Sequence, residues 1–478
     1  MLTKIKKHIH LLAAFAIPLF SYIVTLSPDV LPGDSGEFQA LIPIGGVLHS
    51  SGYPLYLLTG KLFTLILPLG NYAWRLNLLS AVFSALMAAA IAAMLSECGF
   101  SKVFSSSGGI LLALSPMLWR QSIIAEVYAL SALLLSLLWL FGCKSREKKN
   151  LIPVLSLVAG LSLTHHLILV AAIPWPFLIL KRRGYTARMK LISILTFLSP
   201  LLLYAVIPLN ATRWFRRFPG TLLGFPEAVV RGYVSPAWMG GFWKYVIAYN
   251  YTSPSNFSRL PSAKTIASMT VHWITNISAE YSAVGLALAL LGTVWLYKKR
   301  SPLLTFTVPT FLAVSAFSSL YSWRYHEETG FLVIAVLSAG IWIASGIEAL
   351  WQETHGWKRV VPALLALAIL TWEIRAFQNS PAYWTENPGN GHTPRRWAEA
   401  ALVEAEPNSV IFGSWGLITP LRYLQFVEHQ REDVVVVHAP LGDRQFMASL
   451  IEEARESGRK PYLLLPDPHT GGKLLPAK

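Results

Sequence analysis

The chain has 478 residues, of which 54% are hydrophobic and 14% are charged, and its mean hydropathy is +0.47. Soluble domains carry about 25% charged residues. This composition and the recurring long apolar runs exclude a soluble globular protein and predict a polytopic membrane protein. The net charge of +15 does not indicate nucleic-acid binding, because much of the basic charge lies in short clusters between apolar runs. Two cysteines, Cys98 and Cys143, argue against a disulfide framework.

The N-terminus combines lysines with an apolar run and so resembles a signal peptide. No small-residue cleavage site follows, so we interpret residues 10–26 as a retained first membrane span. Lys4, Lys6 and Lys7 precede this span and place its start in the cytoplasm by the positive-inside rule. The next segment, 27–73, is therefore expected to be an outer loop.

The other apolar runs predict about ten further spans, with the tail on the same side as the first outer loop. We expect spans near 74–95, 108–119, 127–143, 191–208, 281–297, 303–320, 331–350 and 360–376, an interfacial helix over 54–69 and a long outer loop over 209–270. The apolar run 151–180 lies between two basic clusters, so it must cross twice if both clusters are inside, with its outer turn at Thr164, His165 and His166. A single long, tilted helix is the alternative.

The tail changes character after the last span. It alternates helical patterns at 394–406, 416–430 and 443–457 with strand patterns at 409–413, 433–438 and 461–465. Such alternation predicts a small parallel α/β unit. The expected organisation is thus a transmembrane domain over 1–377 and an α/β domain over 378–478 on the outer face. No Gly-rich phosphate loop is present in the tail, so no nucleotide is expected there.

The predicted topology brings polar side chains from distant segments to the outer face. They are Asp34, Glu37, His49 and Tyr53 from the first outer loop, Glu126 and Tyr128 at the start of the fourth span, His165 and His166, Arg213 in the long loop, and Arg324 after the ninth span. Charged groups at membrane depth are costly and tend to line cavities. A carboxylate can act as a general base, cationic groups stabilise a leaving phosphate, and apolar walls hold a lipid tail. The set therefore favours a lipid-linked phosphate substrate.

Each of these residues also has an ordinary structural interpretation. Asp34 could be a solvated loop acid, and Glu37 the partner of a nearby cation. Glu126 could be a helix-start carboxylate favoured by the helix dipole, and the two histidines polar groups at a helix turn. Arg213 could bind lipid headgroups. The position of the carboxylate pair directly after the first span favours the catalytic interpretation.

Several motifs carry a resemblance to a known family. They are Gly33-Asp-Ser-Gly-Glu37, His49-Ser-Ser-Gly-Tyr-Pro-Leu-Tyr56, Arg75-Leu-Asn-Leu-Leu-Ser80, Ala125-Glu-Val-Tyr128, Gly160-Leu-Ser-Leu-Thr-His-His166 and, in the tail, Leu421–Glu428 with Arg431-Glu-Asp-Val434. With these motifs the chain resembles the GT-C-type multi-span glycosyltransferases that include the animal transmembrane protein O-mannosyltransferase. The resemblance is strong over about 29–170 and extends to 409–440. Two departures are Ser50 and Ser51, where the family often has two prolines, and Ser414-Trp-Gly416, where it has an acidic turn.

The resemblance implies a GT-C fold and an inverting transferase that uses a polyprenyl-phosphate sugar, mannose being the first expectation. It implies that an acid of the first outer loop is the catalytic base, which makes Asp34 the first candidate and Glu37 the second. His49 and Tyr53 would then shape the same site. The acceptor is expected to be a hydroxyl of a protein or of a glycan.

Two functions of other classes compete with transfer. A transporter of a lipid-linked glycan would use the same lipid groove, although the chain shows no clear internal repeat. A non-catalytic assembly subunit would use the tail to dock partners. No cofactor is indicated with certainty, but Asp34, Glu37 and His49 could hold a divalent cation. The expected location is the bacterial inner membrane, with the site and the tail facing the periplasm.

Overall fold

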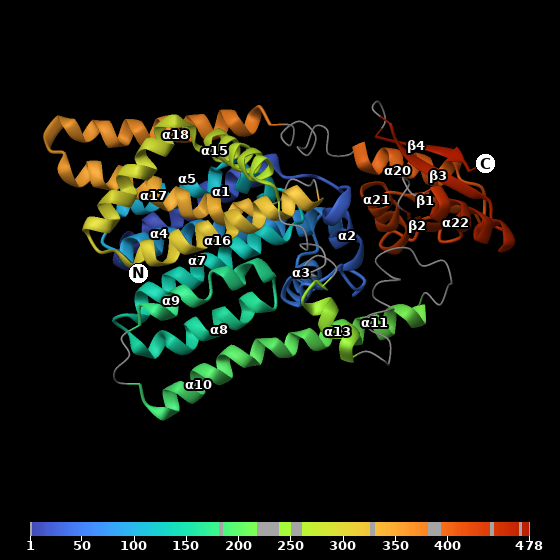
Figure 1. The fold of residues 1–478 in the computed structure, drawn as a ribbon, viewed down its shortest axis with the longest axis horizontal. Helices are drawn as coiled ribbons and strands as arrows, with labels where there is room; N and C mark the ends of the chain where they lie inside the picture. The colour runs from blue at the N-terminus through green and yellow to red at the C-terminus, as the bar shows by residue number, and fades with distance from the viewer. Residues whose placement is uncertain are drawn as a thin grey trace.

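The computed structural model describes residues 2–180, 185–217, 239–249, 261–325, 330–380, 393–439, 444–467 and 471–477. It has two parts, a helical bundle formed by most of the chain and a smaller unit of strands and helices formed by the C-terminal residues (Figure 1). The helix α2 (Gly33–Leu41) lies at the end of the bundle that faces this smaller unit. The first outer segment and the tail therefore share one end of the molecule, as the sequence predicts.

The long helices of the bundle follow the apolar runs of the sequence. They are α1 (Leu2–Thr25), α4 (Tyr72–Glu97), α7 (Val127–Ser145), α15 (Ala263–Lys298), α16 (Pro302–Tyr325), α17 (Leu332–Glu353) and α18 (Val360–Gln378). The shorter ones are α3 (Pro54–Ile66), α5 (Lys102–Leu114), α6 (Pro116–Ser122), η1 (Lys149–Leu151), α8 (Ile152–Leu163), η2 (Leu167–Ala171), α9 (Pro174–Leu178), α10 (Ala187–Leu198), η3 (Ser199–Ala205), α11 (Val206–Arg217), α13 (Met239–Val246) and η5 (Gly356–Arg359). Four helices begin at a side chain that accepts a backbone N–H of the first turn, namely at Asn71, Ser101, Thr186 and Ser262.

Within the described residues, eight stretches are long and apolar enough to cross a membrane. They are His8–Thr25, Tyr72–Glu97, Val127–Ser145, Ala187–Ala211, Ala263–Lys298, Pro302–Tyr321, Leu332–Glu353 and Gly356–Gln378. The three other predicted spans coincide with shorter apolar helical stretches, Lys102–Leu114, Lys149–Leu163 and Leu167–Leu178. The prediction of a multi-pass helical membrane protein is confirmed.

The apolar run 151–180 is broken where the sequence predicts. The helix α8 ends at Leu163, and the chain resumes a helical course only at Leu167. The segment between them holds Thr164, His165 and His166. A single long helix through this run is therefore excluded, and the run forms two short antiparallel passes in the bundle (Figure 1).

Two predicted segments, 108–119 and 209–270, differ in their helical structure from the prediction. The third span, predicted at 108–119, is divided at Ser115 and Pro116, because proline cannot continue the preceding helix. The loop predicted at 209–270 is helical at both ends, since α11 extends to Arg217 and α15 begins at Ala263. Within the same predicted loop, α13 forms a further helix.

Glycines bring α15 and α17 into direct backbone contact. A Cβ built on Gly292 would lie 1.9 Å from the carbonyl oxygen of Trp342, and one built on Gly346 would lie 2.2 Å from that of Leu288. Small residues allow such close helix crossings, which replace the hydrophobic driving force that is missing inside a membrane. This crossing fixes α17, which is buried along most of its length.

Replacing Gly346 by leucine is expected to lower the free energy of unfolding by about 1–3 kcal/mol or more, because the side chain would force two backbones apart. The thermal unfolding midpoint in detergent measures the loss. Gly416→Ala is the control, since an added Cβ there meets no atom closer than 4.0 Å. Equal midpoints for the two variants would contradict the close crossing.

The C-terminal unit contains a four-stranded sheet in the order β2-β1-β3-β4. The strands are β1 (Val410–Gly413), β2 (Val435–His438), β3 (Pro461–Asp467) and β4 (Gly471–Pro476), and the helices are α20 (Thr393–Glu404), α21 (Trp415–Phe426) and α22 (Arg444–Glu456). β1 pairs in parallel with β2 and with β3, which confirms the predicted parallel α/β unit. The antiparallel edge strand β4 was not predicted, because it is short and two of its six residues are glycine.

One arginine joins this unit to the start of the first outer segment. The guanidinium of Arg395 donates to both carboxylate oxygens of Asp29, at 2.5 and 3.0 Å, and to both oxygens of Glu428, at 2.6 and 2.8 Å. The side chain of Asp29 is only 4% exposed. Bidentate pairing of this kind fixes orientation as well as distance, so the unit is held in one position against the bundle.

Buried amides hold the same segment on its other side. The side-chain amide of Asn77 donates to the carbonyl of Ser27 and accepts from the amide of Gln39, at 2.9 and 2.8 Å. Gln39 in turn accepts the backbone N–H of Leu31 at 2.9 Å. These groups are buried, so each bond avoids the cost of an unsatisfied polar group. The segment before α2 is thus anchored to α4.

Candidate functional site

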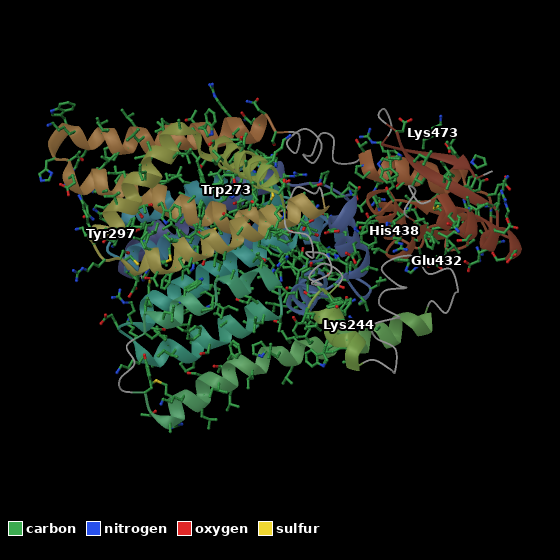
Figure 2. The ribbon with its side chains drawn as sticks, in the orientation of Figure 1. Lys244, Trp273, Tyr297, Glu432, His438 and Lys473 are labelled. Atoms are coloured by element: carbon green, nitrogen blue, oxygen red, sulfur yellow. The ribbon has the colours of Figure 1, made fainter. Side chains whose placement is uncertain are left out.

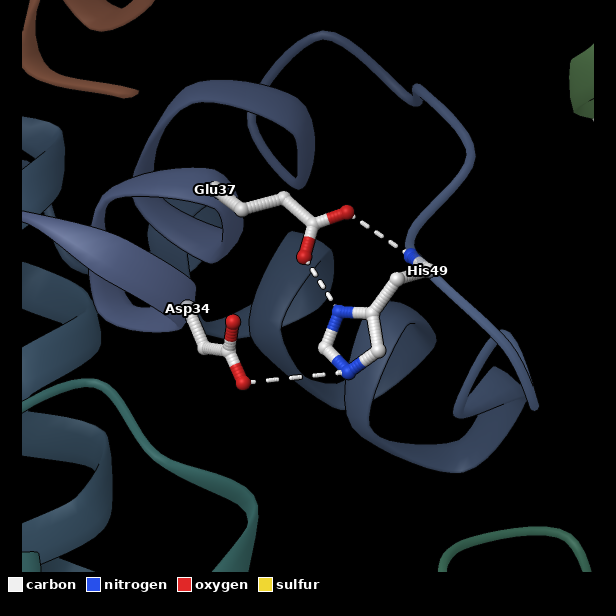
Figure 3. A group of neighbouring side chains, drawn as sticks. All are labelled: Asp34, Glu37 and His49. Atoms are coloured by element: carbon white, nitrogen blue, oxygen red, sulfur yellow. Dashed lines mark hydrogen bonds and ion pairs between the residues drawn. The ribbon is translucent and has the colours of Figure 1, made fainter. Parts of the chain in front are cut away.

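The two carboxylates of the first outer segment lie on one helix. Asp34 is in the first turn of α2 and Glu37 follows one turn later, so both project to the same side (Figure 3). The sequence predicted a loop here, because the Gly and Pro content masked a helix of nine residues. The helix matters for chemistry, since its N-terminus favours a negative charge at Asp34.

Glu37 is committed to His49. One oxygen of its carboxylate accepts the backbone N–H of His49 at 2.7 Å, and the other lies 2.5 Å from Nδ1 of the imidazole ring. Glu37 is 2% exposed. On the far side of the ring, Nε2 of His49 lies 3.0 Å from Oη of Tyr53 and 3.8 Å from Oδ2 of Asp34. The imidazole therefore links the buried carboxylate to the exposed one (Figure 3).

The surrounding carboxylates keep His49 protonated. Burial alone would lower the pKa of His49, but the charges of Glu37 and Asp34 outweigh it and raise the pKa to about 9. Burial, with the charge of Asp34, raises the pKa of Glu126 to about 8. At neutral pH the site thus combines the imidazolium of His49 with a neutral Glu126 beside the carboxylate of Asp34.

This pairing predicts a pH-dependent stability. A histidine whose pKa rises from 6.5 to about 9 on folding stabilises the protein fully below pH 6.5 and loses that contribution as the pH rises through 9. The thermal unfolding midpoint should therefore fall between about pH 7 and pH 10. In Glu37→Gln the fall should shrink, because the lost carboxylate lets burial lower the pKa of His49.

The control for this prediction is Glu432→Gln. Glu432 also pairs with a histidine, His429, but its side chain is 63% exposed. Solvent screens such a pair, so this variant should follow the wild-type pH profile. An unchanged profile in Glu37→Gln would contradict the imidazolium assignment.

Asp34 is the carboxylate that remains accessible. Its side chain is 48% exposed. Its Oδ1 accepts the indole N–H of Trp415 at 2.9 Å, a contact across 381 residues of sequence. Glu37, in contrast, has both oxygens occupied by His49. The first and second candidates for the base therefore differ in the structure: Asp34 faces a cavity, and Glu37 supports the ring beside it.

Asp34 opens onto a cavity of about 950 Å³. Six of the predicted site residues line it: Asp34, His49, Tyr53, Glu126, Tyr128 and His166. Much of the remaining wall is apolar, with Ile124, Leu167, Ile168, Val170, Phe317 and Phe331. The structure thus brings these six residues from distant segments to one cavity, whereas Glu37 and His165 do not line it. A second cavity of about 470 Å³ shares Arg120, Gln121 and Gly330 with it.

Glu126 lies at the start of α7 and, like Asp34, lines the large cavity. It is the N-cap residue of α7, but its side chain makes no capping bond. Its carboxyl group instead accepts the hydroxyl of Ser35 at 3.3 Å, and its backbone N–H donates to Ser80 at 3.4 Å. Glu126 therefore lies at a helix start, as the alternative of a carboxylate favoured by the helix dipole expects, and it also lines the cavity.

The two adjacent histidines have different environments. Nε2 of His165 bonds the carbonyl of Val127 at 2.7 Å, and burial lowers its pKa to about 4. His166 lines the cavity, and its Nδ1 accepts the backbone N–H of Ile168 at 3.1 Å. Burial lowers the pKa of His166 to about 3. His165 thus fixes backbone at the start of α7, and the neutral ring of His166 faces the cavity.

Arg213 and Arg324 lie on helices α11 and α16, but their side chains are outside the described residues. The cavity residues that were not predicted as site residues include Arg120, Trp415 and His438. Arg120 could have been chosen, because the predicted topology places it at the outer end of the third span. No pattern in the sequence indicated that Trp415 and His438 belong to the site, since only the folded unit brings them to the cavity.

Asp34, Glu37 and His49 were also predicted as ligands of a divalent cation. Each offers a ligand atom, and these atoms lie within 4.8 Å of one another. In the observed arrangement one oxygen of Glu37 accepts the backbone N–H of His49, and the other oxygen is paired with Nδ1 of the same residue. A cation would have to break that pair to use all three ligands, so the present geometry fits an ion pair and not a preformed metal site.

The segment that contains Asp34, Glu37 and His49 is similar in sequence to known proteins. Residues 34–189 match the sequence profile described as the protein O-mannosyl-transferase TMEM260 N-terminal domain. The chain is 32% identical to protein O-mannosyl-transferase TMEM260 of Mus musculus over 232 residues, which cover 45% of this chain and 32% of the mouse protein. It is 24% identical to protein O-mannosyl-transferase tmem260 of Dictyostelium discoideum over 306 residues, 57% of this chain and 34% of that protein. The chain thus spans about a third of the length of these curated relatives.

Solved structures show a similar fold. The crystal structure of ArnT from Cupriavidus metallidurans bound to undecaprenyl phosphate aligns with 94% of this chain and 92% of its own, with a TM-score of 0.51 and 13% identity. The apo structure of the same protein aligns with 95% of this chain and 92% of its own, with a TM-score of 0.52 and 11% identity. The predicted GT-C-like architecture is confirmed at the level of the fold.

Proposed function

We propose that this protein is an inverting membrane glycosyltransferase that moves a sugar from a polyprenyl-phosphate donor to an acceptor hydroxyl. The observation that carries the proposal is the accessible carboxylate of Asp34 on the wall of a large, mostly apolar cavity. The TMEM260-like region contains this carboxylate, and the named relatives are protein O-mannosyl-transferases. Mannose is accordingly the donor sugar that we test first.

In this proposal Asp34 is the general base. Its carboxylate takes the proton of the acceptor hydroxyl while the acceptor oxygen forms a bond to the anomeric carbon of the sugar. The bond from that carbon to the phosphate oxygen breaks, and the polyprenyl phosphate leaves with the bonding electron pair. A single displacement of this kind inverts the configuration at the anomeric carbon.

Arg120 is our candidate for contact with the donor phosphate. It is exposed and lines both cavities, at their shared boundary. A guanidinium can pair with phosphate through two parallel bonds and stabilise the charge that develops on the leaving group. Arg213 and Arg324 remain proposals for the same role. Val170, which is 50% exposed, and its apolar neighbours provide a wall for the isoprenoid chain.

Glu37 then supports the site without being the base. Its carboxylate holds the protonated ring of His49, whose Nε2 faces Asp34 and Tyr53. The positive ring lies 3.8 Å from Oδ2 of Asp34 and can orient that carboxylate by charge attraction. Tyr53, Tyr128 and His166 line the same cavity and offer rings and polar atoms to the sugar.

The orientation and organisation follow from the same proposal. Lys4, Lys6 and Lys7, which lie near the start of α1, support an orientation in which the opposite end of the bundle, with Asp34 and the α/β unit, lies outside the cytoplasm. In a bacterium this would be the periplasmic face of the inner membrane. We propose a transmembrane catalytic domain over 1–377 and an α/β domain over 378–478, with a protein Ser or Thr hydroxyl as the first acceptor to test.

The test uses purified full-length protein in liposomes with radiolabelled polyprenyl-phosphate mannose and a Ser/Thr-rich peptide. We expect label on the peptide and free polyprenyl phosphate in equal amounts. The same donor with glucose in place of mannose tests the sugar. A leaflet-translocation assay on the same liposomes tests the transporter alternative.

The outcomes separate the functions. Transfer without translocation supports the proposal, and transfer only with another sugar corrects the donor. Translocation of the intact donor without transfer would instead make the protein a transporter. If neither occurs with any donor and acceptor tried, while substitutions in the tail alone abolish function in cells, the assembly-subunit alternative replaces the proposal.

A further inference from the structure

The carboxylate of Asp34 is held by the C-terminal unit. Trp415 donates its indole N–H to Oδ1 at 2.9 Å. An indole N–H is a donor only, so it cannot exchange roles with the carboxylate. Hydrogen bonds to an ionised acceptor are shorter and stronger than neutral ones. The contact therefore fixes one oxygen of Asp34 and leaves the other, Oδ2, on the side of His49.

The helix that carries Trp415 is docked closely on α2. A Cβ added to Gly36 would lie 2.6 Å from Oγ1 of Thr419 and 2.1 Å from the carbonyl of Leu31, so only glycine permits this approach. Farther along α21, the hydroxyl of Tyr423 accepts the backbone N–H of Ala73 at 3.3 Å. α21 thus touches both the helix that bears Asp34 and the start of α4, and its position relative to Asp34 is fixed.

The same edge of the sheet faces the cavity. One residue, Ser414, separates Trp415 from the end of β1. His438 is the last residue of the neighbouring parallel strand β2. Their rings lie 5.6 Å apart, nearly perpendicular, and both line the large cavity. Figure 2 shows His438 on the side of the unit that faces the bundle. Ligand sites in open α/β sheets lie beyond the carboxyl ends of the strands, and here that edge meets the carboxylate.

We propose that Trp415 is a positioning residue for sugar transfer: its indole N–H holds the Asp34 carboxylate so that Oδ2 faces the acceptor hydroxyl. This inference rests on the proposed function and assigns the C-terminal unit a part in the reaction. It also gives a role to the segment Ser414-Trp415-Gly416, where the resembling family has an acidic turn.

The test replaces Trp415 by phenylalanine in the full-length protein, which keeps an aromatic ring and removes the N–H. We expect kcat to fall about 10- to 100-fold, as for a lost hydrogen bond to a charged group. The donor KM should stay unchanged.

Trp372→Phe is the matched control. The indole of Trp372 donates to the carbonyl of Ala279 at 3.3 Å, and neither residue lines the cavity that contains Asp34, so kcat should stay at the wild-type value. An unchanged kcat in Trp415→Phe would overturn the inference. A rise in donor KM with constant kcat would also overturn it, because Trp415 would then bind substrate and not position the base.

A second measurement does not depend on activity. Carbodiimide with an amine labels accessible carboxyl groups, and mass spectrometry of the peptide that contains Asp34 gives the labelling rate. We expect faster labelling in Trp415→Phe than in the wild type or Trp372→Phe. Equal rates would overturn the positioning role even if transfer occurs. Faster labelling in a protein that transfers no sugar would uphold the contact while the proposed function fails.

Discussion

Replacing Asp34 by asparagine is expected to lower kcat for sugar transfer by about 10²- to 10⁴-fold, which is the usual contribution of a general base. Asparagine has the same shape, and its carbonyl can still accept the indole N–H of Trp415, which now bonds Oδ1. The substitution therefore removes the charge and the proton acceptor without emptying the site. Transfer from radiolabelled polyprenyl-phosphate mannose measures the loss, with protein amount and unfolding midpoint compared in parallel.

Glu432→Gln serves as the control, because it neutralises an exposed carboxylate of the C-terminal unit that does not line the cavity. Its transfer rate should equal that of the wild type. If Asp34→Asn also keeps the wild-type rate, another group removes the acceptor proton. Glu126 would be tested next, since it lines the cavity and its pKa of about 8 would let it act at alkaline pH.

Replacing Arg395 by methionine is expected to lower the free energy of unfolding by about 3–5 kcal/mol, the usual cost of leaving one member of a buried ion pair alone. Arg395 is 18% exposed, and its partner Asp29 is 4% exposed. Methionine keeps much of the side-chain volume but leaves Asp29 and Glu428 without the guanidinium. Since the unit also holds Asp34 through Trp415, the transfer rate should fall together with the unfolding midpoint.

A double-mutant cycle tests whether the loss comes from the ion pair. With Asp29→Asn already in place, adding Arg395→Met should cost less than it does in the wild type. Arg455→Met is the surface control, because Arg455 and Glu452 are 45% and 65% exposed and such pairs contribute about 0–1 kcal/mol. Fully additive losses in the cycle would show that Asp29 and Arg395 act independently.

Much of the helical bundle could be predicted from the sequence, because long apolar runs between basic clusters have few alternatives in a membrane. The two short passes on either side of Thr164 follow from charge alone, and the structure confirms the break. The alternating pattern of the tail likewise predicts β1, β2 and β3 close to their observed bounds. In each case a local property of the sequence decides the structure, namely its hydropathy, its charge or its hydrophobic period.

The site could be predicted only in part. The family motifs and the topology identify Asp34, His49 and Glu126 as neighbours, because all lie at the ends of spans on one face. They do not distinguish the exposed Asp34 from the buried Glu37, since that difference depends on where the ring of His49 lies. Trp415 reaches the site only because Gly36 allows α21 to pack against α2, a tertiary contact without a local pattern.

The ion pair between Asp29 and Arg395 also has a consequence for biosynthesis. The two residues are 366 positions apart in the chain. At roughly 5–20 residues per second, about 20–70 s of translation separate them. During this interval a growing polypeptide can place its spans in the bilayer, but Asp29 still lacks its cation and Asp34 still lacks the indole. Under the proposed function, the nascent chain should therefore reach its full transfer rate only after the ribosome has made the tail, which makes full activation one of the last events of synthesis.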